Sequence, residues 1–276
     1  MAVAGKQLYA WPARKSLAGE LADIVRHRDL LLLLVQKDLK VKYKGAALGF
    51  LWSLLNPLLM MLVYTVVWSF IARFPIHNYQ LFVLSGLLPW NAFSTVIPGA
   101  TASLVGNSNL VRRMRFPLEF LPITPVLSGV VNLLLSLCLL VIFAIVLRQP
   151  LGLPLLTLPI LLILQVVMTS GFALVLSAVL VYFRDVEYLI TIGLTAWFFL
   201  TPVIYPLSAL RGHGKVALLI GLNPLTWLVG GYQAIWHANA WPDWGSLGAL
   251  AVFSFVMLLV GRFVFRRLEP RFAEEV

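Results

Sequence analysis

The sequence predicts an all-α integral membrane protein, and its composition is the first observation that points there. Of the 276 residues, 61% are hydrophobic and only 12% are charged, and the mean hydropathy is +0.92. Soluble domains carry about 25% charged residues, so this chain has too little polar surface to cover a globule in water. The second observation is a series of long apolar stretches, each suited to crossing a bilayer. We expect a single transmembrane domain over residues 1–276.

Six of these stretches are long enough to form transmembrane helices, which need about 20 predominantly apolar residues. None of the six contains a lysine or an arginine. Pro57 and Pro89 fall inside them, where we expect kinks because proline removes a helix hydrogen bond. The predicted spans are residues 47–72, 81–103, 121–147, 155–181, 188–204 and 246–260.

The segment before the first span covers residues 1–46. Its first 28 residues are polar and charged, without the short apolar stretch of a cleavable signal peptide, and we expect none. Residues 29–39 contain a short apolar run between basic residues. The run is too short to cross a bilayer, so it predicts an amphipathic helix in the cytoplasmic interface. Gly45 and Gly49 have the spacing that allows close packing of two helices.

The stretch 216–236 is apolar but interrupted by Asn223, Pro224 and several glycines. Such interrupted pieces more often re-enter the membrane than cross it. With six spans and both termini inside, the cytoplasmic segments hold 17 of the 21 Lys and Arg residues, whereas a seventh span would leave 13 inside. The positive-inside rule therefore favours six spans over residues 47–260, a re-entrant hairpin at about 205–245, and a cytoplasmic tail at 261–276.

The sequence lacks the residues that several classes of function need. The sequence has no G-x-x-x-x-G-K-[ST] phosphate loop, no metal-ligand spacing among its four histidines, and no acidic residue near the centre of a span. The lone Cys138 excludes a disulfide framework. We expect no catalytic residues, no metal and no cofactor. The net charge of +10 is explained by membrane orientation, so nucleic acid is not an expected partner.

The cytoplasmic connection after the second span, residues 107–119, contains three arginines among apolar residues. Asn107 or Ser108 is suited to cap a short helix, and Pro117 to end it. Such a helix would expose Leu110, Val111, Met114 and Phe116. Two interpretations remain open, an interfacial turn held at the lipid headgroups and a docking helix that inserts into a groove of a soluble partner.

At this point the sequence resembles a known family, the permease subunits of ATP-binding-cassette exporters of bacterial polysaccharides. The resemblance covers essentially the whole chain and rests on the order and spacing of short motifs. These are Lys37-Asp38-Leu39-Lys40-Val41-Lys42-Tyr43-Lys44 before residues 45–52, Asn56-Pro57, Leu88-Pro89-Trp90, residues 109–117, Phe183-Arg184-Asp185, Pro202-Val203-Ile204-Tyr205 and Asn223-Pro224-Leu225.

The resemblance implies six spans, paired re-entrant helices, and an assembly of two permeases with two ATPase subunits that hold ATP and Mg. It also implies an ATPase-coupling helix made of Asn107, Asn109, Leu110, Arg112, Arg113, Met114, Arg115, Phe116 and Pro117. Gln233 stands where the family pattern leads us to expect an arginine.

The resemblance further implies that residues 37–44 form a gate helix near the phosphates of an undecaprenyl-type lipid-linked polysaccharide. Its candidate residues are Lys37, Lys40, Lys42, Tyr43 and Lys44. Lysines bind phosphate well, which agrees with this role. The alternative is that these lysines snorkel to anchor the chain at membrane lipids.

Aromatic residues supply the last signal, because sugar rings stack on aromatic faces. The candidates for a channel wall are Trp52, Trp90, Trp197, Phe198 and Phe199, and those for a gate on the periplasmic side are Tyr205, Asn223, Pro224, Trp227, Tyr232 and Trp236, with Trp241 and Trp244 nearby. The alternative is an aromatic girdle at headgroup level.

The combined hypothesis is a homodimeric permease in the bacterial inner membrane that exports lipid-linked polysaccharide, with O-antigen first, driven by a separate ATPase. Capsule and teichoic-acid export remain alternatives, as does a small-molecule or drug exporter of the same superfamily. A membrane-embedded lipid-modifying enzyme is the remaining rival, and Arg184, Asp185 and Glu187 form its only compact charged set. These three residues also suit the cap of a short cytoplasmic turn.

Overall fold

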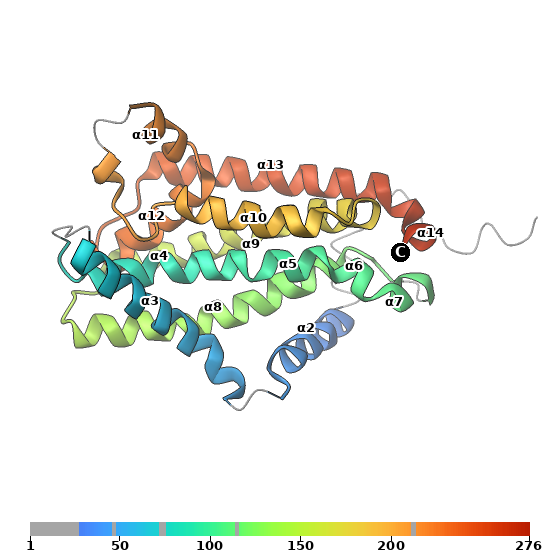
Figure 1. Cartoon of the computed structure of the whole chain (residues 1–276), viewed down its shortest axis with the longest axis horizontal. Helices are drawn as coiled ribbons and strands as arrows, with labels where there is room; N and C mark the ends of the chain where they lie inside the picture. Colours follow the sequence, from blue (N-terminus) through green and yellow to red (C-terminus); the bar gives the residue numbers. More distant parts are fainter. Residues whose placement is uncertain (1–27, 46–47, 72–75, 114–115, 211–213) are drawn as a thin grey trace, which may run out of the picture.

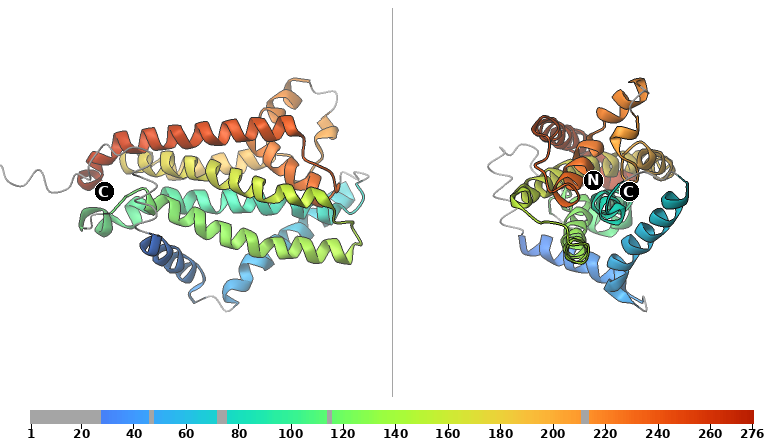
Figure 2. Two further views of the ribbon diagram at one scale, coloured as in Figure 1. Left: turned by 180° about the vertical axis from the view of Figure 1, so that it is seen from behind. Right: turned by 90° about the vertical axis from the view of Figure 1, so that its left-hand side faces the viewer.

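The computed structural model describes residues 28–45, 48–71, 76–113, 116–210 and 214–276. These residues form helices joined by turns, in agreement with the predicted all-α class. Most of the long helices run side by side along the longest axis of the molecule (Figure 1). The views from behind and from the end show the same bundle, with α2 and α3 splayed away from it (Figure 2).

Among the described residues, four helical stretches are long and apolar enough to cross a membrane. The first, Tyr79–Thr101, joins α4 (Tyr79–Ser94) to α5 (Val96–Thr101), with Pro89 inside α4. The others contain α8 (Phe120–Val146), α9 (Leu158–Tyr182, after the short η2 at Leu153–Thr157) and α13 (Trp244–Leu268).

Two further apolar helices are shorter than the sequence predicts. α3 (Trp52–Ile71) contains Pro57, and α10 (Val186–Phe199) ends five residues before the predicted end of its span. A turn over residues 200–205 follows α10. The count of six spans therefore stays a prediction, because 14 residues of α helix reach only about 21 Å.

The closest helix pair in the bundle is α9 with α13, and two glycines make this approach possible. A β-carbon added to Gly261 would lie 2.5 Å from the carbonyl oxygen of Gly171, and one added to Gly171 would lie 2.6 Å from the backbone of Met257. Backbone atoms cannot rotate away as a side-chain end can. The two helix backbones are therefore in direct contact at this point.

The N-terminal helix α2 (Arg28–Tyr43) extends beyond the predicted amphipathic stretch and includes most of the lysine run. Between α2 and α3, Gly45 and Gly49 have φ angles of +82° and +48°. These left-handed conformations suit glycine because it lacks a β-carbon. The sequence predicted that this glycine pair packs two helices together. In the structure neither glycine lies within an α-helix: Gly45 follows α2, and Gly49 begins η1 (Gly49–Leu51), which leads into α3.

One end of the bundle, which we call the basic end, carries exposed arginines. It contains α6 (Ser103–Gly106), α7 (Ser108–Arg113), η4 (Glu269–Arg271) and α14 (Phe272–Glu275). Within the segment 261–276, predicted as a cytoplasmic tail, α13 continues to Leu268 and the chain then folds back, burying Phe272 completely. The exposed arginines are Arg112, Arg184, Arg266, Arg267 and Arg271.

Hydrogen bonds between loops hold the opposite end of the bundle together. Asn78 donates to the Gln149 side chain at 3.1 Å, and Gln149 donates to the carbonyl of His237 at 2.7 Å. The segment with η3 (Leu207–Leu210), α11 (Gly214–Gly221) and α12 (Pro224–Trp236) lies at this end (Figure 1). Its helix–break–helix order agrees with the interruption read from the sequence at Asn223.

Candidate functional site

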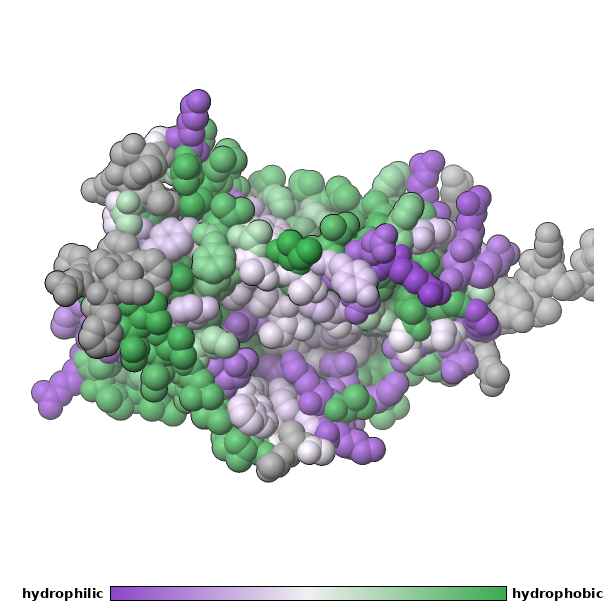
Figure 3. Space-filling view, in the orientation of Figure 1, coloured by the Kyte–Doolittle hydropathy of each residue, from purple (hydrophilic) through white to green (hydrophobic). Residues whose placement is uncertain are grey.

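One side of the bundle carries more polar residues than is usual for a surface that faces lipid. Pale and purple residues occupy the middle of the face shown in Figure 3, between green regions. α10 runs along this side (Figure 1) and is exposed over most of its length, including Thr191, Gly193 and Thr195. The two threonine hydroxyls donate to carbonyls of their own helix, Glu187 at 3.1 Å and Thr191 at 3.0 Å, beside exposed apolar residues such as Ile192. Their oxygens can still accept a hydrogen bond from water or a polar ligand. We call this side the open face.

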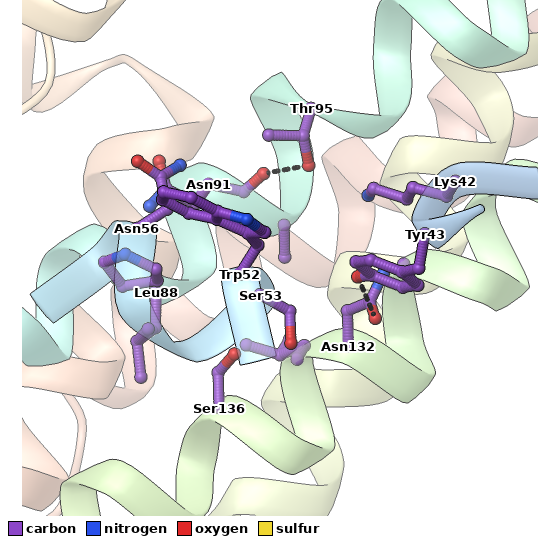
Figure 4. Close-up of a pocket in the computed structure, with 14 residues that line it drawn as sticks. Lys42, Tyr43, Trp52, Ser53, Asn56, Leu88, Asn91, Thr95, Asn132 and Ser136 are labelled. Atoms are coloured by element: carbon purple, nitrogen blue, oxygen red, sulfur yellow. Dashed lines mark hydrogen bonds between the residues drawn. The ribbon is translucent and has the colours of Figure 1, made fainter. Parts of the chain in front are cut away.

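A pocket of about 350 Å³ lies between the end of α2 and the helices α3, α4 and α8. Figure 4 shows the labelled side chains gathered around it. Half of the lining residues are lysine, serine, threonine or asparagine, although α3, α4 and α8 are mostly apolar helices. The lining residues are Lys42, Tyr43, Trp52, Ser53, Asn56, Pro57, Leu88, Asn91, Ala92, Thr95, Gly129, Asn132, Leu133 and Ser136.

Hydrogen bonds fix part of this pocket and leave another part available. The Tyr43 hydroxyl donates to the Asn132 side chain at 2.9 Å, which ties α2 to α8. The Thr95 hydroxyl donates to the backbone carbonyl of Asn91 at 2.6 Å, one turn back in the helix. Among the described residues, the side-chain nitrogen of Asn91 is buried without a hydrogen-bond partner. A buried amide donor that is not bonded costs free energy.

Lys42 gives the pocket its cation. Its side chain points from α2 toward the pocket in Figure 4. Burial lowers the pKa of the Lys42 ammonium group, and the nearby Asp38 carboxylate partly offsets this effect. Desolvation weakens the charged form of an amine unless an anion is close. The site is therefore suited to an anionic or strongly polar group.

The predicted channel aromatics divide into buried and exposed residues. Trp90 and Phe198 are buried, with ring centroids 5.4 Å apart, and Trp197 packs edge-on against Phe93 at 5.6 Å. Trp90 and Phe198 therefore pack inside the bundle, and Trp197 is half-buried. Trp52 and Phe199 are exposed, at 44% and 62%.

Asn223 connects the end of α10 to the start of α12. Its side-chain oxygen accepts from the Trp197 indole at 2.9 Å and from the Leu225 backbone at 3.0 Å. Its side-chain nitrogen donates to the Leu200 carbonyl at 3.1 Å and to the Thr201 hydroxyl at 3.0 Å. With Pro224 at the first position of α12, this arrangement is a capped helix start.

The other predicted gate residues surround this junction. The Tyr205 hydroxyl donates to the Phe199 carbonyl at 2.8 Å, and the Trp227 indole donates to the Gly221 carbonyl at 2.7 Å. Tyr232 and Trp236, predicted for the gate on the periplasmic side, are buried at 0% and 2% exposure.

Two glutamine side chains form hydrogen bonds inside this part of the bundle, and no pattern in the sequence pointed to the first. Gln165 donates to the Pro89 carbonyl at 2.9 Å and accepts from the Tyr232 hydroxyl at 3.0 Å, so it links α4, α9 and α12. Gln233 donates to the Pro202 carbonyl at 3.1 Å. A neutral amide therefore holds the turn after α10 at the position where an arginine is expected.

The coupling segment forms the predicted short helix α7, which begins after Asn107. Of the residues expected to point outward, Leu110 is half-buried, whereas Val111 in α7 and Phe116 after it are buried. Val111 and Phe116 are each 6% exposed and pack with Phe265 and Phe272, because burying them against the chain's own basic end removes apolar surface from water. Met114 and Arg115 lie outside the described residues, as does the side chain of Arg113.

The outward side of α7 is polar. Asn109 and Arg112 are exposed, and Arg112 donates to the Val276 carbonyl. The Lys37 amine donates to the side-chain oxygen of Asn107 at 3.4 Å, so the predicted gate helix and the predicted coupling segment are in contact.

A carboxylate pair lies beside the same segment. Arg266 donates to Glu119 at 3.3 Å. Burial, and then the charge of Glu269, raises the pKa of Glu119 to about 7. The pKa of Glu269 is also raised by burial, with Arg266 opposing the shift.

Comparisons with known proteins cover nearly all of these elements. Residues 29–236 match the family described as ABC-2 type transporter. The O-antigen export system permease protein RfbA of Myxococcus xanthus is 36% identical over 254 residues, 92% of this chain and 98% of the relative. A protein of the same name from Klebsiella pneumoniae is 30% identical over 247 residues, 89% of this chain and 94% of the relative. The polysialic acid transport protein KpsM of Escherichia coli is 22% identical over 243 residues, 84% of this chain and 91% of the relative.

Proposed function

The chain belongs to the ABC-2 type transporter family, and from this premise we propose that it is the membrane permease of an exporter for lipid-linked polysaccharide. O-antigen is the first candidate for the cargo. The single observation that carries the proposal is the 36% identity to a relative named as an O-antigen export permease over 92% of this chain. Because the similarity extends through the whole bundle, it includes the helices that carry the open face and the pocket.

We place the basic end in the cytoplasm and the opposite end on the periplasmic side of the bacterial inner membrane. The positive-inside rule supports this orientation, because the exposed arginines gather at one end. α3 and α10 complete six spans in this arrangement, and α11 with α12 forms the re-entrant hairpin. α3 alone, with 20 residues, is about 30 Å long, close to the thickness of the hydrocarbon core.

Two copies enclose the path of the glycan in this proposal, with their open faces toward each other. A hydrophilic polymer needs a wet surface across the bilayer, and the exposed hydroxyls of Thr191 and Thr195 on α10 support such a role. Trp52 and Phe199 are the exposed members of the predicted channel aromatics. They are available for stacking with sugar rings, whereas Trp90 and Phe198 shape the bundle behind them.

Energy comes from a separate ATPase subunit, one for each permease, which binds ATP and Mg. α7 with Asn109 and Arg112 is the proposed contact for this subunit. Its buried side anchors it to α13 and α14 through Val111 and Phe116. A helix anchored in this way transmits a push to the bundle because packed side chains resist compression.

α2 is the proposed gate helix for the lipid diphosphate. Lys37, Lys40 and Lys44 are exposed along it, and lysine ammonium groups bind phosphate as point charges. The contact between Lys37 and Asn107 supports a mechanical link between this helix and the coupling segment.

A gene deletion in the host tests the proposal. Cells that lack the chain should lose surface polysaccharide and accumulate lipid-linked glycan inside, and the chain expressed from a plasmid should restore export. Co-purification should recover a separate ATPase whose activity rises when the chain is present. Normal surface polysaccharide together with changed resistance to a small molecule would contradict the proposal and favour a drug exporter.

A further inference from the structure

The pocket between α2, α3, α4 and α8 is lined by more polar side chains than is usual among apolar helices. Polar groups at membrane depth are costly unless they bind one another or meet water or a ligand. Asn56 comes from α3, Asn91 and Thr95 from α4, and Asn132 and Ser136 from α8. Three helices that are otherwise apolar therefore each direct polar side chains to one space.

The size and shape of this space suit a small polar ligand. Its volume of about 350 Å³ lies within the range of about 300–1,000 Å³ that is typical of small-molecule sites. The exposed Thr95 and Asn56 place its opening at the surface, while Ser136 is only 5% exposed and lies deeper. Figure 4 shows Lys42 on one side and Trp52 across the space.

The hydrogen-bonding groups of the pocket match hydroxyl groups. An amide side chain offers both a donor and an acceptor, and a serine hydroxyl does the same. A sugar ring presents several hydroxyls that each donate and accept, with an apolar face that an indole can cover. Asn91 lines the pocket, and among the described residues its buried side-chain nitrogen lacks a partner, so rotation of the amide toward a ligand hydroxyl would satisfy it and recover the desolvation cost.

We propose that this pocket is a binding site for the sugar adjacent to the lipid diphosphate, with its hydroxyls on Asn91 and Ser136, its ring against Trp52 and the phosphate side toward Lys42. This inference rests on the proposed function and adds to it a subsite within a single copy of the chain. The pocket holds the first sugar at rest, before the polymer moves along the open face. A phospholipid headgroup offers the same phosphate chemistry without a sugar ring, and the experiments below separate the two.

The first experiment fills the pocket. Ser136→Phe places a ring inside it, whereas Leu135→Phe changes the next residue of α8, which is 39% exposed and does not line the pocket. With equal membrane levels and equal ATPase co-purification, Ser136→Phe should lower surface polysaccharide roughly tenfold, the effect of losing about 1.4 kcal/mol of binding, while Leu135→Phe should leave it unchanged. Equal export by both variants would overturn the subsite.

The second experiment identifies the occupant in the full complex. A photo-crosslinking amino acid replaces Ser136 or Leu135 in cells that make the polysaccharide, and the partner ATPase carries a substitution that prevents hydrolysis. Glycan antibody should detect an adduct at position 136 and none at 135, because the loaded lipid-linked glycan waits in the pocket. A third position, Phe199 on the open face, should give an adduct only when hydrolysis is allowed.

These outcomes separate the subsite from the proposed function. An adduct at position 136 that contains phospholipid and no glycan would overturn the subsite while export by the wild-type chain stands. An adduct at Phe199 without one at 136 would do the same, because it shows passage without a resting site. Surface polysaccharide that does not depend on the chain at all would overturn the proposed function itself.

Discussion

The indole nitrogen of Trp197 donates a hydrogen bond of 2.9 Å to the side-chain oxygen of Asn223. This bond joins the last turn of α10 to the first turn of α12, across the point where the sequence predicts a break. The same asparagine also caps α12 and binds the backbone after α10. The junction is therefore held by one polar side chain at four points.

Asn223→Leu should weaken this junction more than Trp197→Phe. The leucine removes the partner of the Trp197 nitrogen, the Leu225 nitrogen and the Leu200 carbonyl, and each of these part-buried or exposed hydrogen bonds contributes about 0.5–1.5 kcal/mol. Trp197→Phe removes one of these bonds. Thermal unfolding of the purified chain, with the double variant to complete the cycle, measures the coupling. If the two changes lowered stability equally and additively, Asn223 would not be the residue that joins α10 to α12.

The contact between α9 and α13 predicts a strong difference between two glycines of one helix. Gly261→Ala places a β-carbon against the carbonyl of Gly171, and we expect a loss of about 1–3 kcal/mol from overpacking. Gly248→Ala is the matched control, since a β-carbon there meets nothing within 4 Å; it should be neutral or slightly stabilising. Melting temperatures in one detergent compare them, and similar values would contradict the close approach.

The proposed ATPase contact depends on the exposed side of α7. Arg112→Glu should reduce recovery of the ATPase subunit in a pull-down roughly tenfold or more, because charge reversal at an interface introduces repulsion. Arg184→Glu changes another exposed arginine of the basic end, outside α7. It should leave recovery near the wild-type level. Full recovery with Arg112→Glu would remove this residue from the contact.

The raised pKa of Glu119, about 7, predicts a pH dependence of stability. An unfolded glutamate titrates near 4.3, so between these two pH values the folded chain keeps a proton that the unfolded chain has lost. Stability should therefore fall as the pH rises through this window and level off above it. Glu119→Gln should flatten the curve of melting temperature against pH between 5 and 7.5. A curve with the wild-type slope would show that another group is responsible.

The six-span arrangement predicts opposite labelling of two arginine positions. In a Cys138→Ala background, Arg148→Cys should react with an impermeant thiol reagent from the periplasmic side, and Arg184→Cys should react only after the membrane is opened. Both residues are exposed in the structure, so burial does not hide them. Arg271→Cys should behave like Arg184→Cys, and its labelling from outside would indicate an odd number of spans.

Hydropathy located the long helices well where a segment is uniformly apolar. The predicted spans 121–147 and 155–181 correspond closely to α8 (Phe120–Val146) and α9 (Leu158–Tyr182). It failed at two helix ends. α10 stops at Phe199 although apolar residues follow, and α13 continues past its first arginine, Arg262, because helix propensity is indifferent to that charge.

The sequence by itself determined the class of the protein, because composition and apolar length leave a bilayer as the only suitable solvent. It also determined the short helix before Pro117 and the break at Asn223, since capping side chains and proline act on neighbouring backbone. Only the tertiary structure decided which apolar residues face protein and which face lipid or a ligand. Trp90 and Phe199 look alike in sequence, yet one is buried and the other is exposed. The pocket was beyond the sequence for the same reason, since Lys42, Asn91 and Ser136 meet only when three distant segments pack.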